Sequence, residues 1–224
     1  MIEILDVHHR FGDRVVLDAI ELRIDERRVA VIGANGSGKS TLVRLINGLL
    51  VPERGTVRVD GLDTRVDARA VRRKVGFVFQ DPDAQIVMPL VEEDIAFGLK
   101  NLGLGKADIA RKVDGVLARY GLSHLRSAGT HTLSAGEKQL LALSSVLVME
   151  PDYVVFDEPM TLLDLRNKRM MIRVLEGLPQ TAVVVSHDLD MLAGFDRVLV
   201  MEAGRIVMDA PPAVAVPYYC GMMT

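Results

Sequence analysis

The architecture of this 224-residue chain follows from one stretch, Gly33-Ala34-Asn35-Gly36-Ser37-Gly38-Lys39-Ser40. The run before it, residues 28–33, is short, rich in β-branched residues and almost continuously apolar, as expected of a strand buried on both faces. The run after it, residues 39–49, favours a helix. A strand, a glycine-rich loop and a helix in this order open an α/β unit, so we expect an α/β fold.

The loop has the chemistry of a phosphate site. It fits G-x-x-x-x-G-K-[ST] in the strand, loop and helix context that the motif requires. Its glycines let backbone N–H groups approach phosphate oxygens, and the helix N-terminus adds a favourable dipole. Lys39 is expected at the β- and γ-phosphates and the Ser40 hydroxyl at Mg²⁺. An ordinary glycine turn before a helix is the alternative. The predicted nucleotide-binding residues here are Gly33, Ala34, Asn35, Gly36, Ser37, Gly38, Lys39, Ser40 and Thr41.

Two acids suit the metal that accompanies such phosphates. Asp157 and Glu158 follow the apolar run 153–156, which is expected to be a buried strand. Adjacent acids there are costly unless they are used, and strand alternation points them to different places at the carboxyl edge of the sheet. Asp157 is predicted to bind Mg²⁺, directly or through water, and Glu158 to face the attacking water as general base or orienting group. A solvated pair of strand-end acids is the alternative.

Composition narrows the function classes. The chain has 27 Lys and Arg against 30 Asp and Glu, which gives no general field for attracting nucleic acid. The single cysteine, Cys220, cannot form an internal disulfide and fits a reducing compartment. Acids in the first six residues argue against a signal peptide. The most apolar stretch, residues 140–149, is shorter than the roughly 20 residues of a membrane span. We therefore expect neither a nucleic-acid partner nor a spanning segment.

The rest of the chain adds a second sheet and a helical insert. Alternating apolar residues predict two half-exposed, antiparallel strands at residues 2–7 and 17–24. Strand signals vanish between about residues 90 and 125, where residues 106–120 have the period of an amphipathic helix. The other expected elements are strands at 56–60, 75–79, 181–185, 197–201 and 205–208, helices at 68–74, 135–149 and 165–178, and a tail from 211 that is irregular or a short helix.

A further motif resembles that of a known family. Leu133-Ser134-Ala135-Gly136-Glu137 is similar to the LSGGQ signature of the nucleotide-binding subunits of ATP-binding-cassette (ABC) transporters, and the similarity extends over essentially the whole chain. A serine and backbone amides at a helix start make a second phosphate site. The resemblance implies that Ser134 and Gly136 contact ATP held by a partner subunit, so that two chains sandwich two nucleotides. Ser134 also fits a helix N-cap with Glu137 completing a capping box, and both roles are compatible.

Four other positions match the family pattern. The resemblance implies that Phe11 stacks on adenine and that Gln80 reaches Mg²⁺ and the attacking water. It also implies that Asp164 lies in a loop crossing the dimer interface and that His187 contacts the γ-phosphate. A strand-end core position for Phe11 and a structural role for His187 are the alternatives. The predicted catalytic residues are Glu158, His187 and Gln80, and the predicted metal ligands are Ser40, Gln80 and Asp157.

The sequence departs from the family pattern in two places. Ala135 and Glu137 replace Gly and Gln of the signature. Backbone donation survives an alanine, whereas Glu137 adds negative charge near the partner's phosphates and predicts slow or partner-dependent turnover. Met160 and Leu162 replace the small or hydroxyl residues usual before the interface aspartate, which affects the interface geometry without removing a catalytic group.

Residues 80–104 narrow the type of transporter. They are similar to the ATPases of energy-coupling-factor (ECF) transporters, which import vitamins and the metal ions cobalt and nickel. In that group a second glutamine, here Gln85, stands five residues after the first, and the acidic pair Glu92-Glu93 follows on the surface that receives the membrane coupling protein. These acids and exposed apolar residues at 86–88 predict a groove for basic amphipathic helices. A solvated acidic helix start is the alternative.

The resemblance implies an α/β fold of the P-loop NTPase class and ABC ATPase type in a single domain. A mixed parallel core sheet with an antiparallel β subdomain is expected at about 1–89 and 150–224, and a helical subdomain at about 90–149. The implied protein is an ATP-hydrolysing, Mg²⁺-dependent homodimer, peripheral at the cytoplasmic face of the inner membrane. It would bind an integral membrane coupling protein and a substrate-binding membrane protein through the region Gln80 to Gly98.

The compact chain looks like that of the dedicated biotin or cobalt systems. Overall resemblance makes biotin the expected substrate, although no residue of this chain is expected to touch it. Cobalt or nickel is the alternative within the same type. A soluble ABC protein without a transport role is an alternative from another class. Such proteins usually carry long inserts, paired cassettes or basic surfaces, and this sequence shows none of these. A P-loop kinase or regulatory nucleotide-binding module leaves the signature and His187 unexplained.

Overall fold

Two sheets form the body of the protein in the computed structural model, which describes residues 1–161 and 163–223. The six-stranded core sheet has the order β10-β9-β3-β8-β7-β6 and the four-stranded sheet the order β2-β1-β4-β5. The core-sheet strands are β3 (Arg28–Gly33), β6 (Val75–Val78), β7 (Tyr153–Asp157), β8 (Thr181–Val185), β9 (Arg197–Glu202) and β10 (Arg205–Ala210). The second sheet contains β1 (Ile2–Phe11), β2 (Arg14–Ile24), β4 (Arg54–Val59) and β5 (Leu62–Asp63).

The core sheet is parallel except at one edge, where β10 pairs antiparallel with β9. Its central strands β3 and β7 are buried along their whole length, which explains their unbroken apolar runs. Successive residues face opposite layers. Val29 and Val31 contact the antiparallel sheet side, whereas Ala30 and Ile32 contact the helices on the other face. Because β3, β6, β7 and β8 run parallel, their carboxyl ends meet at one edge of the sheet.

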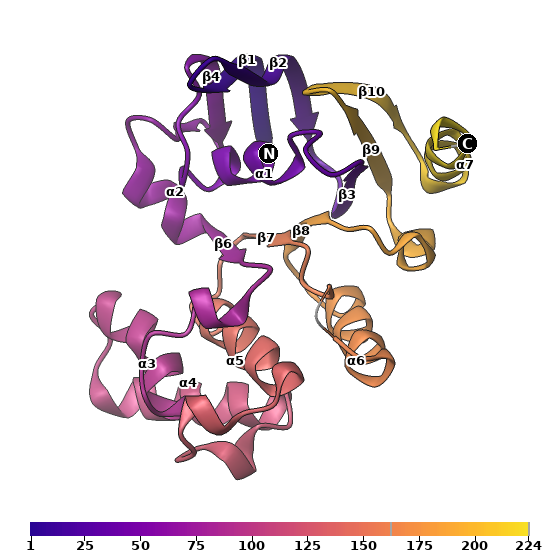
Figure 1. Cartoon of the computed structure of the whole chain (residues 1–224). Coiled ribbons are helices and arrows are strands. Elements are labelled where there is room, and N and C mark those ends of the chain that lie inside the picture. Colours follow the sequence, from indigo (N-terminus) through magenta and orange to yellow (C-terminus); the bar gives the residue numbers. More distant parts are fainter. Residues whose placement is uncertain (162, 224) are drawn as a thin grey trace.

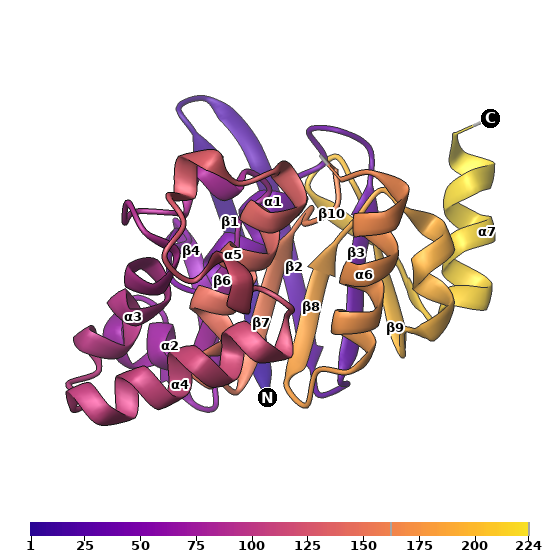
Figure 2. The ribbon, with the colours of Figure 1, turned by 90° about the horizontal axis from the view of Figure 1, so that it is seen from below.

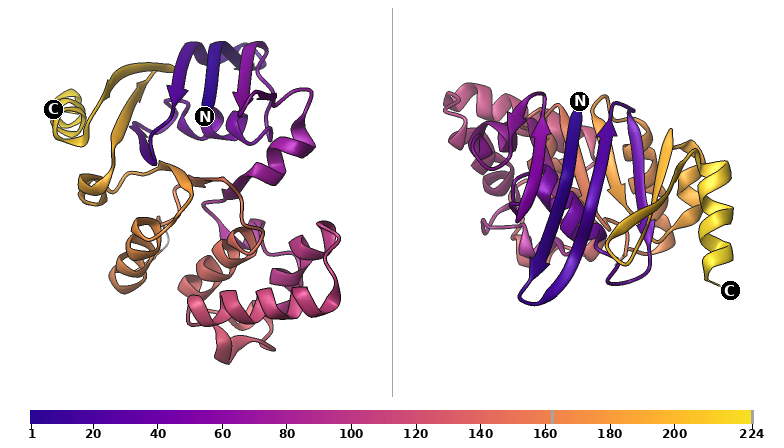
Figure 3. Two further views of the ribbon diagram at one scale, coloured as in Figure 1. Left: turned by 180° about the vertical axis from the view of Figure 1, so that it is seen from behind. Right: turned by 90° about the horizontal axis from the view of Figure 1, so that it is seen from above.

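The helices cover the core sheet on both faces (Figure 1). Helix α1 (Lys39–Ile46) lies between the two sheets, where Leu42 and Ile46 share a core with both. Helices α5 (Ala135–Leu147), α6 (Leu165–Glu176) and α7 (Pro212–Met222) pack on the opposite face and edge, as Figure 2 shows from below. The antiparallel sheet lies on the far side of α1 from the core sheet, and it is the nearest layer in the view from above (Figure 3, right).

A helical subdomain extends from the β6 side of the sheet. It contains α3 (Val91–Asn101) and α4 (Lys106–Arg119), which pack on α5 around a separate apolar core. Helix α5 belongs to both cores, because Leu143 and Val146 face the sheet while Leu140 and Leu141 face α3 and α4. One helix therefore joins the helical subdomain to the sheet.

The remaining elements are short. Helix α2 (Ala68–Lys74) precedes β6 and lies at the outer side of the body (Figure 1). Short 3₁₀ helices occur at η1 (Pro82–Ala84), η2 (Ser123–Leu125), η3 (Thr130–Thr132) and η4 (Leu189–Gly194). Among the described residues, no helix combines the length and apolar character that crossing a bilayer requires.

The predicted element order is confirmed, with differences at the ends. The strands expected at 2–7 and 17–24 extend towards each other into a hairpin, because cross-strand pairing continues to Phe11 and Arg14. The helix expected at 39–49 ends at Ile46, where the Asn47 amide donates to the carbonyl of Val75 at 2.6 Å and Gly48 takes a positive φ of 71°. The chain after 211 is the helix α7, which has Pro217 in its interior.

Candidate functional site

The glycine loop after β3 has a backbone that only glycine adopts easily. Gly33 and Gly38 have φ values of 151° and 104°. A Cβ on Gly33 would lie 2.2 Å from the Met201 carbonyl oxygen, and one on Gly38 would lie 2.7 Å from that of Val16. Side chains are therefore excluded by both conformation and space. The loop turns directly into α1, whose N-terminal N–H groups are free to meet an anion.

Two side chains of the loop are buried without an anionic partner. Lys39 is only 4% exposed, and its Nζ donates to the carbonyl oxygens of Gly33 at 2.8 Å and Ala34 at 3.0 Å. Burial lowers the pKa of Lys39, and the carboxylates of Glu158 and Asp157 partly offset that effect. The Ser37 hydroxyl is buried and has no hydrogen-bond partner among the described residues. A buried ammonium and an unpartnered buried hydroxyl beside a glycine cradle fit a phosphate group.

Asp157 ends β7 next to this loop. Its Oδ1 accepts a hydrogen bond from the Ser40 hydroxyl at 2.7 Å, and its Oδ2 lies 3.0 Å from Nη2 of Arg44. The carboxylate is 2% exposed, so Arg44 compensates a charge that would be expensive alone. A serine hydroxyl beside a carboxylate is the hard oxygen pair that holds Mg²⁺ together with phosphate oxygens, so these residues fit the ion.

Arg44 is a site residue that the sequence prediction missed. It stands four residues after Ser40 on the same helix, and residues at that spacing share a face. The spacing alone could therefore have placed Arg44 beside the strand-end acid.

Glu158 lies between the loop and the end of β8. Its Oε1 is 2.9 Å from Nε2 of His187, and its Oε2 accepts a hydrogen bond from the Thr161 hydroxyl at 3.1 Å. The backbone of Glu158 has a φ of 54°, a conformation that costs energy outside glycine and is typical of functional positions. Its N–H donates to the Val185 carbonyl, which fixes this turn against β8. Two strand ends therefore hold the carboxylate.

A cavity of about 450 Å³ joins the phosphate loop to the hairpin of β1 and β2. Phe11 and Arg14 of the hairpin line it together with Lys39 and Glu158. Phe11 is 53% exposed and meets His9 edge-on, with ring centroids 4.9 Å apart. An exposed aromatic face beside a phosphate loop is suited to stacking on a base. The loop residues that line the cavity are Asn35, Gly36, Gly38, Lys39, Ser40 and Thr41.

Arg14 is the second residue that the sequence prediction missed. Its Nη2 lies 3.2 Å from the place where a Cβ on Gly36 would stand. Arg14 reaches this place because it pairs with Phe11 across the hairpin. The alternating pattern covers residues 2–7 and 17–24 only, so it gives no sign of this pairing.

The signature residues form a separate site at the start of α5. Ser134 is the exposed N-cap, and it forms both halves of a capping box with Glu137. Gly136 is buried under Asn167 of α6, whose amide atoms lie within 2.4 to 2.7 Å of where a Cβ would stand. Asp164 is the N-cap of α6, where its side chain accepts from the N–H of Asn167 at 2.8 Å. None of these residues lines the cavity of the phosphate loop.

Other predicted positions lie outside this cluster. Gln80 follows β6 and is exposed, and it does not line the cavity of the phosphate loop. Met160 is buried in the core below the sheet edge, while Leu162 lies outside the described residues. Within the described part of the chain, no three His, Cys, Asp or Glu residues gather as a metal site. A metal would therefore need phosphate or water ligands to complete its coordination.

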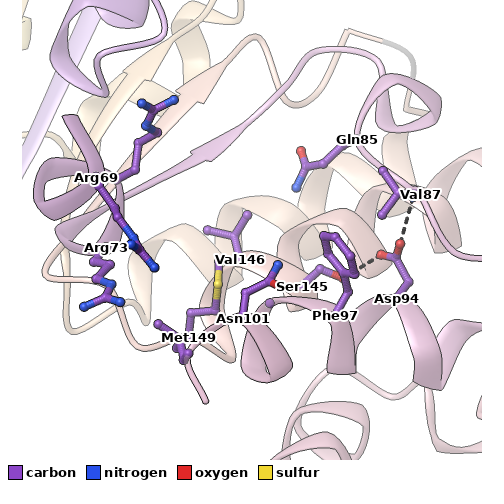
Figure 4. A pocket seen from close by; sticks show the side chains of 13 residues that line it. Arg69, Arg73, Gln85, Val87, Asp94, Phe97, Asn101, Ser145, Val146 and Met149 are labelled. Carbon is purple, nitrogen blue, oxygen red and sulfur yellow. Dashed lines mark hydrogen bonds between the residues drawn. The ribbon is translucent and has the colours of Figure 1, made fainter. Parts of the chain in front are cut away.

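A larger groove of about 480 Å³ lies between α2, α3 and α5 (Figure 4). Phe97, Val87 and Met149 form its apolar part. Gln85 lies at its end and connects the two halves of the molecule, because its Oε1 accepts from the N–H of Phe79 at 3.1 Å and its Nε2 donates to the Ala142 carbonyl at 2.8 Å. Of the apolar residues predicted at 86–88, Val87 lines this groove, whereas Ile86 packs against the core of the helical subdomain.

The predicted acidic lining of this groove is wrong. Glu92 and Glu93 do not line it, and Glu92 points instead to Arg126, whose Nε lies 2.7 Å from its carboxylate. The wall opposite Phe97 carries cations, because α2 presents Arg69, Arg72 and Arg73 to the groove. None of the three forms an ion pair within the described chain. The prediction considered only residues 80–98, whereas these cations come from α2, which precedes that segment and faces it across the groove.

Asp94 is the acid that the groove does contain. It is 4% exposed, and its Oδ1 accepts from the backbone N–H groups of Val87 and Met88 at 2.8 and 3.1 Å. Its Oδ2 accepts from the Ser145 hydroxyl at 2.8 Å. Figure 4 shows the hydrogen bonds of Asp94 with Val87 and Ser145. Asp94 therefore fixes the segment of Val87 rather than offering a free charge.

Comparison with known proteins places the chain among ATP-binding proteins of ABC transporters. The family model described as "ABC transporter" matches residues 17–161. The chain is similar to the biotin transport ATP-binding protein BioM of Rhizobium etli, with 50% identity over 93% of each chain. It is also similar to the cobalt import ATP-binding protein CbiO of Syntrophus aciditrophicus, with 43% identity over 96% of this chain and 79% of the relative.

A solved structure shares the fold over nearly the full length. This is cbiO1 from Clostridium perfringens, described as part of the ABC transporter complex cbiONQ, with a TM-score of 0.84 and 32% identity over 99% of this chain and 93% of that one. The phosphate loop, the strand-end acids and these similarities lead to one family assignment. The chain belongs to the ABC transporter family, as an ATP-binding and ATP-hydrolysing subunit of the energy-coupling-factor import type.

Proposed function

We propose that this chain powers a biotin importer by binding ATP and Mg²⁺ at the phosphate loop and hydrolysing the ATP in a homodimer. The observation that carries the chemistry is the convergence of Lys39, Asp157 and Glu158 at one sheet edge, within reach of the same cavity. The similarity to BioM supports biotin as the cargo. Cobalt remains the second candidate because of the similarity to CbiO.

In this proposal the loop holds the triphosphate. The Lys39 ammonium exchanges its two carbonyl acceptors for the β- and γ-phosphate oxygens, and the loop N–H groups take the remaining oxygens. Ser40 and Asp157 hold Mg²⁺, which neutralises charge on the phosphate oxygens when bound. Phe11 and Arg14 border the base end of the cavity, where the ring stacks on adenine.

Glu158 takes the proton of the attacking water. The oxygen of that water bonds to the γ-phosphorus while the bond to the bridging oxygen of ADP breaks, and the proton passes to the carboxylate. His187 holds this carboxylate at 2.9 Å, so the carboxylate is oriented before the water arrives. Gln80 is exposed at the end of β6, which leaves it free to approach the nucleotide from the membrane-protein side.

A second copy of the chain completes the site. Ser134 and Gly136 lie at the start of α5 and do not line the nucleotide cavity of their own chain. In the sandwich arrangement they contact the γ-phosphate held by the partner, with Asp164 at the interface between the two copies. Closing on ATP and opening after hydrolysis then transmit force to a transport complex.

The groove beside α3 receives the membrane coupling protein. Its apolar part suits one face of an amphipathic helix, while the arginines of α2 favour acidic groups on the side of that helix that faces them. Gln85 joins this groove to the end of β6, so movement of the docked helix reaches Gln80. The chain is then peripheral at the cytoplasmic face of the membrane.

Uptake by a reconstituted complex tests the cargo. The chain is co-expressed with the membrane proteins encoded beside it, inserted in vesicles with internal ATP, and assayed with labelled biotin and with Co²⁺. ATP-dependent biotin uptake that Lys39→Ala abolishes supports the proposal. Uptake of Co²⁺ without uptake of biotin would show that cobalt, not biotin, is the cargo. Failure to co-purify any integral membrane protein from native membranes refutes the transport role.

A further inference from the structure

The signature serine is already engaged within its own chain. Its hydroxyl donates to Oε2 of Glu137 at 2.6 Å, and its backbone N–H donates to the same oxygen at 2.8 Å. In return the N–H of Glu137 donates to the Ser134 hydroxyl oxygen at 3.4 Å. A hydroxyl has one proton to donate. The proton that would meet a partner's phosphate is therefore held by a carboxylate.

No Lys or Arg in the described chain forms an ion pair with that carboxylate, and His124 is the basic side chain near enough to act on its charge. The adjacent Lys138 is committed to Asp83 at 2.7 Å. The hydroxyl and then the backbone N–H of Ser134 hold the pKa of Glu137 below its ordinary value, so the group is charged at neutral pH. The start of α5 consequently presents a negative charge at its exposed end.

The helix start cannot easily move to separate the two anions. Gly136 is packed under the Asn167 amide, which blocks displacement of α5 towards α6. A phosphate oxygen bonded to the Ser134 hydroxyl lies about 2.7 Å from Oγ. Glu137 Oε2 lies 2.6 Å from the same atom, so both anions crowd one hydroxyl unless the glutamate side chain turns away.

We propose that Glu137 competes with the partner's γ-phosphate for Ser134 and so opposes closure of the two chains on ATP. The inference rests on the proposed sandwich. It makes Glu137 a positioning residue that sets the affinity of dimer closure, because the serine is released only when the carboxylate rotates away. A glutamine at this position keeps the size of the side chain and removes the competing charge.

The test measures closure without hydrolysis. All variants carry Glu158→Gln, and the dimer dissociation constant is measured by sedimentation velocity in saturating ATP and Mg²⁺. Glu137→Gln is compared with the parent and with Glu150→Gln, a matched loss of charge just beyond the other end of α5, where Glu150 pairs with Lys112 at 2.6 Å. ATP affinity of the separate chains is measured alongside.

We expect Glu137→Gln to tighten dimerisation by at least about tenfold, because removing a unit charge a few ångströms from phosphate is worth that much even at high effective dielectric. Glu150→Gln should stay within about twofold, since exposed ion pairs contribute little. Glu137→Ala separates competition from capping. Competition predicts tighter dimers despite a lower melting temperature, whereas a purely structural cap predicts unchanged or weaker dimers.

Unchanged or weaker dimerisation of Glu137→Gln beside a dimerising parent overturns the inference and leaves the sandwich intact. If the parent stays monomeric while Glu137→Gln dimerises, competition is supported in its strongest form. If neither associates with ATP, the sandwich itself fails and this inference fails with it. The uptake assay separates that result from the transport role.

Discussion

Replacing Asp94 tests whether the groove floor depends on one buried carboxylate. In Asp94→Ala the N–H groups of Val87 and Met88 and the Ser145 hydroxyl all lose their acceptor. Each buried group left unpaired costs about 1 to 3 kcal/mol. Val87 is largely exposed, so water reaches part of this segment. We therefore expect a loss near the low end of the sum, about 3 kcal/mol of unfolding free energy.

The isosteric variant separates hydrogen bonding from charge. In Asp94→Asn the remaining oxygen still accepts from both backbone N–H groups, and the new amide donates to the Ser145 hydroxyl, which can also accept. Only charge assistance is lost, so the expected cost is about 1 kcal/mol. Asp108→Ala, which removes an exposed acid paired with Arg111 on α4, should cost less than about 0.5 kcal/mol.

Urea unfolding at pH 7 measures all three variants. The same samples, offered to membranes that contain the transport proteins, should show weaker retention of Asp94→Ala than of Asp94→Asn, because the segment of Val87 forms part of the groove. The reasoning is refuted if the alanine and asparagine variants lose equal stability, or if Asp94→Ala loses no more than the Asp108 control.

Three further outcomes are expected. Glu158→Gln should bind ATP as tightly as the wild type and lose about a thousandfold in turnover; hydrolysis at the wild-type rate would remove this residue from the proposed role. Burial alone would raise the pKa of Asp60, but hydrogen bonds led by that of Lys74 hold it well below the ordinary value, so this pair contributes stability above about pH 4 that is lost as pH falls. Asp60→Asn should flatten the acid branch of an unfolding-versus-pH curve, and an unchanged acid branch would contradict this. Gly76→Ala places a Cβ 2.3 Å from Cγ1 of Val146 and should lower the unfolding free energy by about 1 to 3 kcal/mol. Adding Val146→Ala should recover part of that stability, as measured by thermal melts of the double variant.

Local signals predicted the parts of the site that lie within one strand, loop and helix. The phosphate loop and the acids after β7 follow from short runs whose neighbours fix their conformation, and the capping box of Ser134 and Glu137 is a spacing of three residues. The order of the elements followed for the same reason. Each of these features depends on residues adjacent in sequence.

Contacts between distant segments could not be predicted in the same way. The arginines of α2 line the groove because α2 lies across it from α3 and α5, so the sequence suggested an acidic surface where the fold makes a basic wall. Likewise, Arg14 enters the nucleotide cavity because the hairpin of β1 and β2 bends over the loop. Helix α7 has no charged residue to mark a polar face, which hid its period.

The bond from Lys39 to its own loop has a kinetic consequence. Because the ammonium donates to the carbonyl oxygens of Gly33 and Ala34, the loop has an internal cation that supports its shape. Nucleotide entry then exchanges one set of acceptors for another and does not require the loop to refold. The association rate of ATP should therefore depend on diffusion and access, and show little of the temperature dependence that accompanies ordering of a flexible segment.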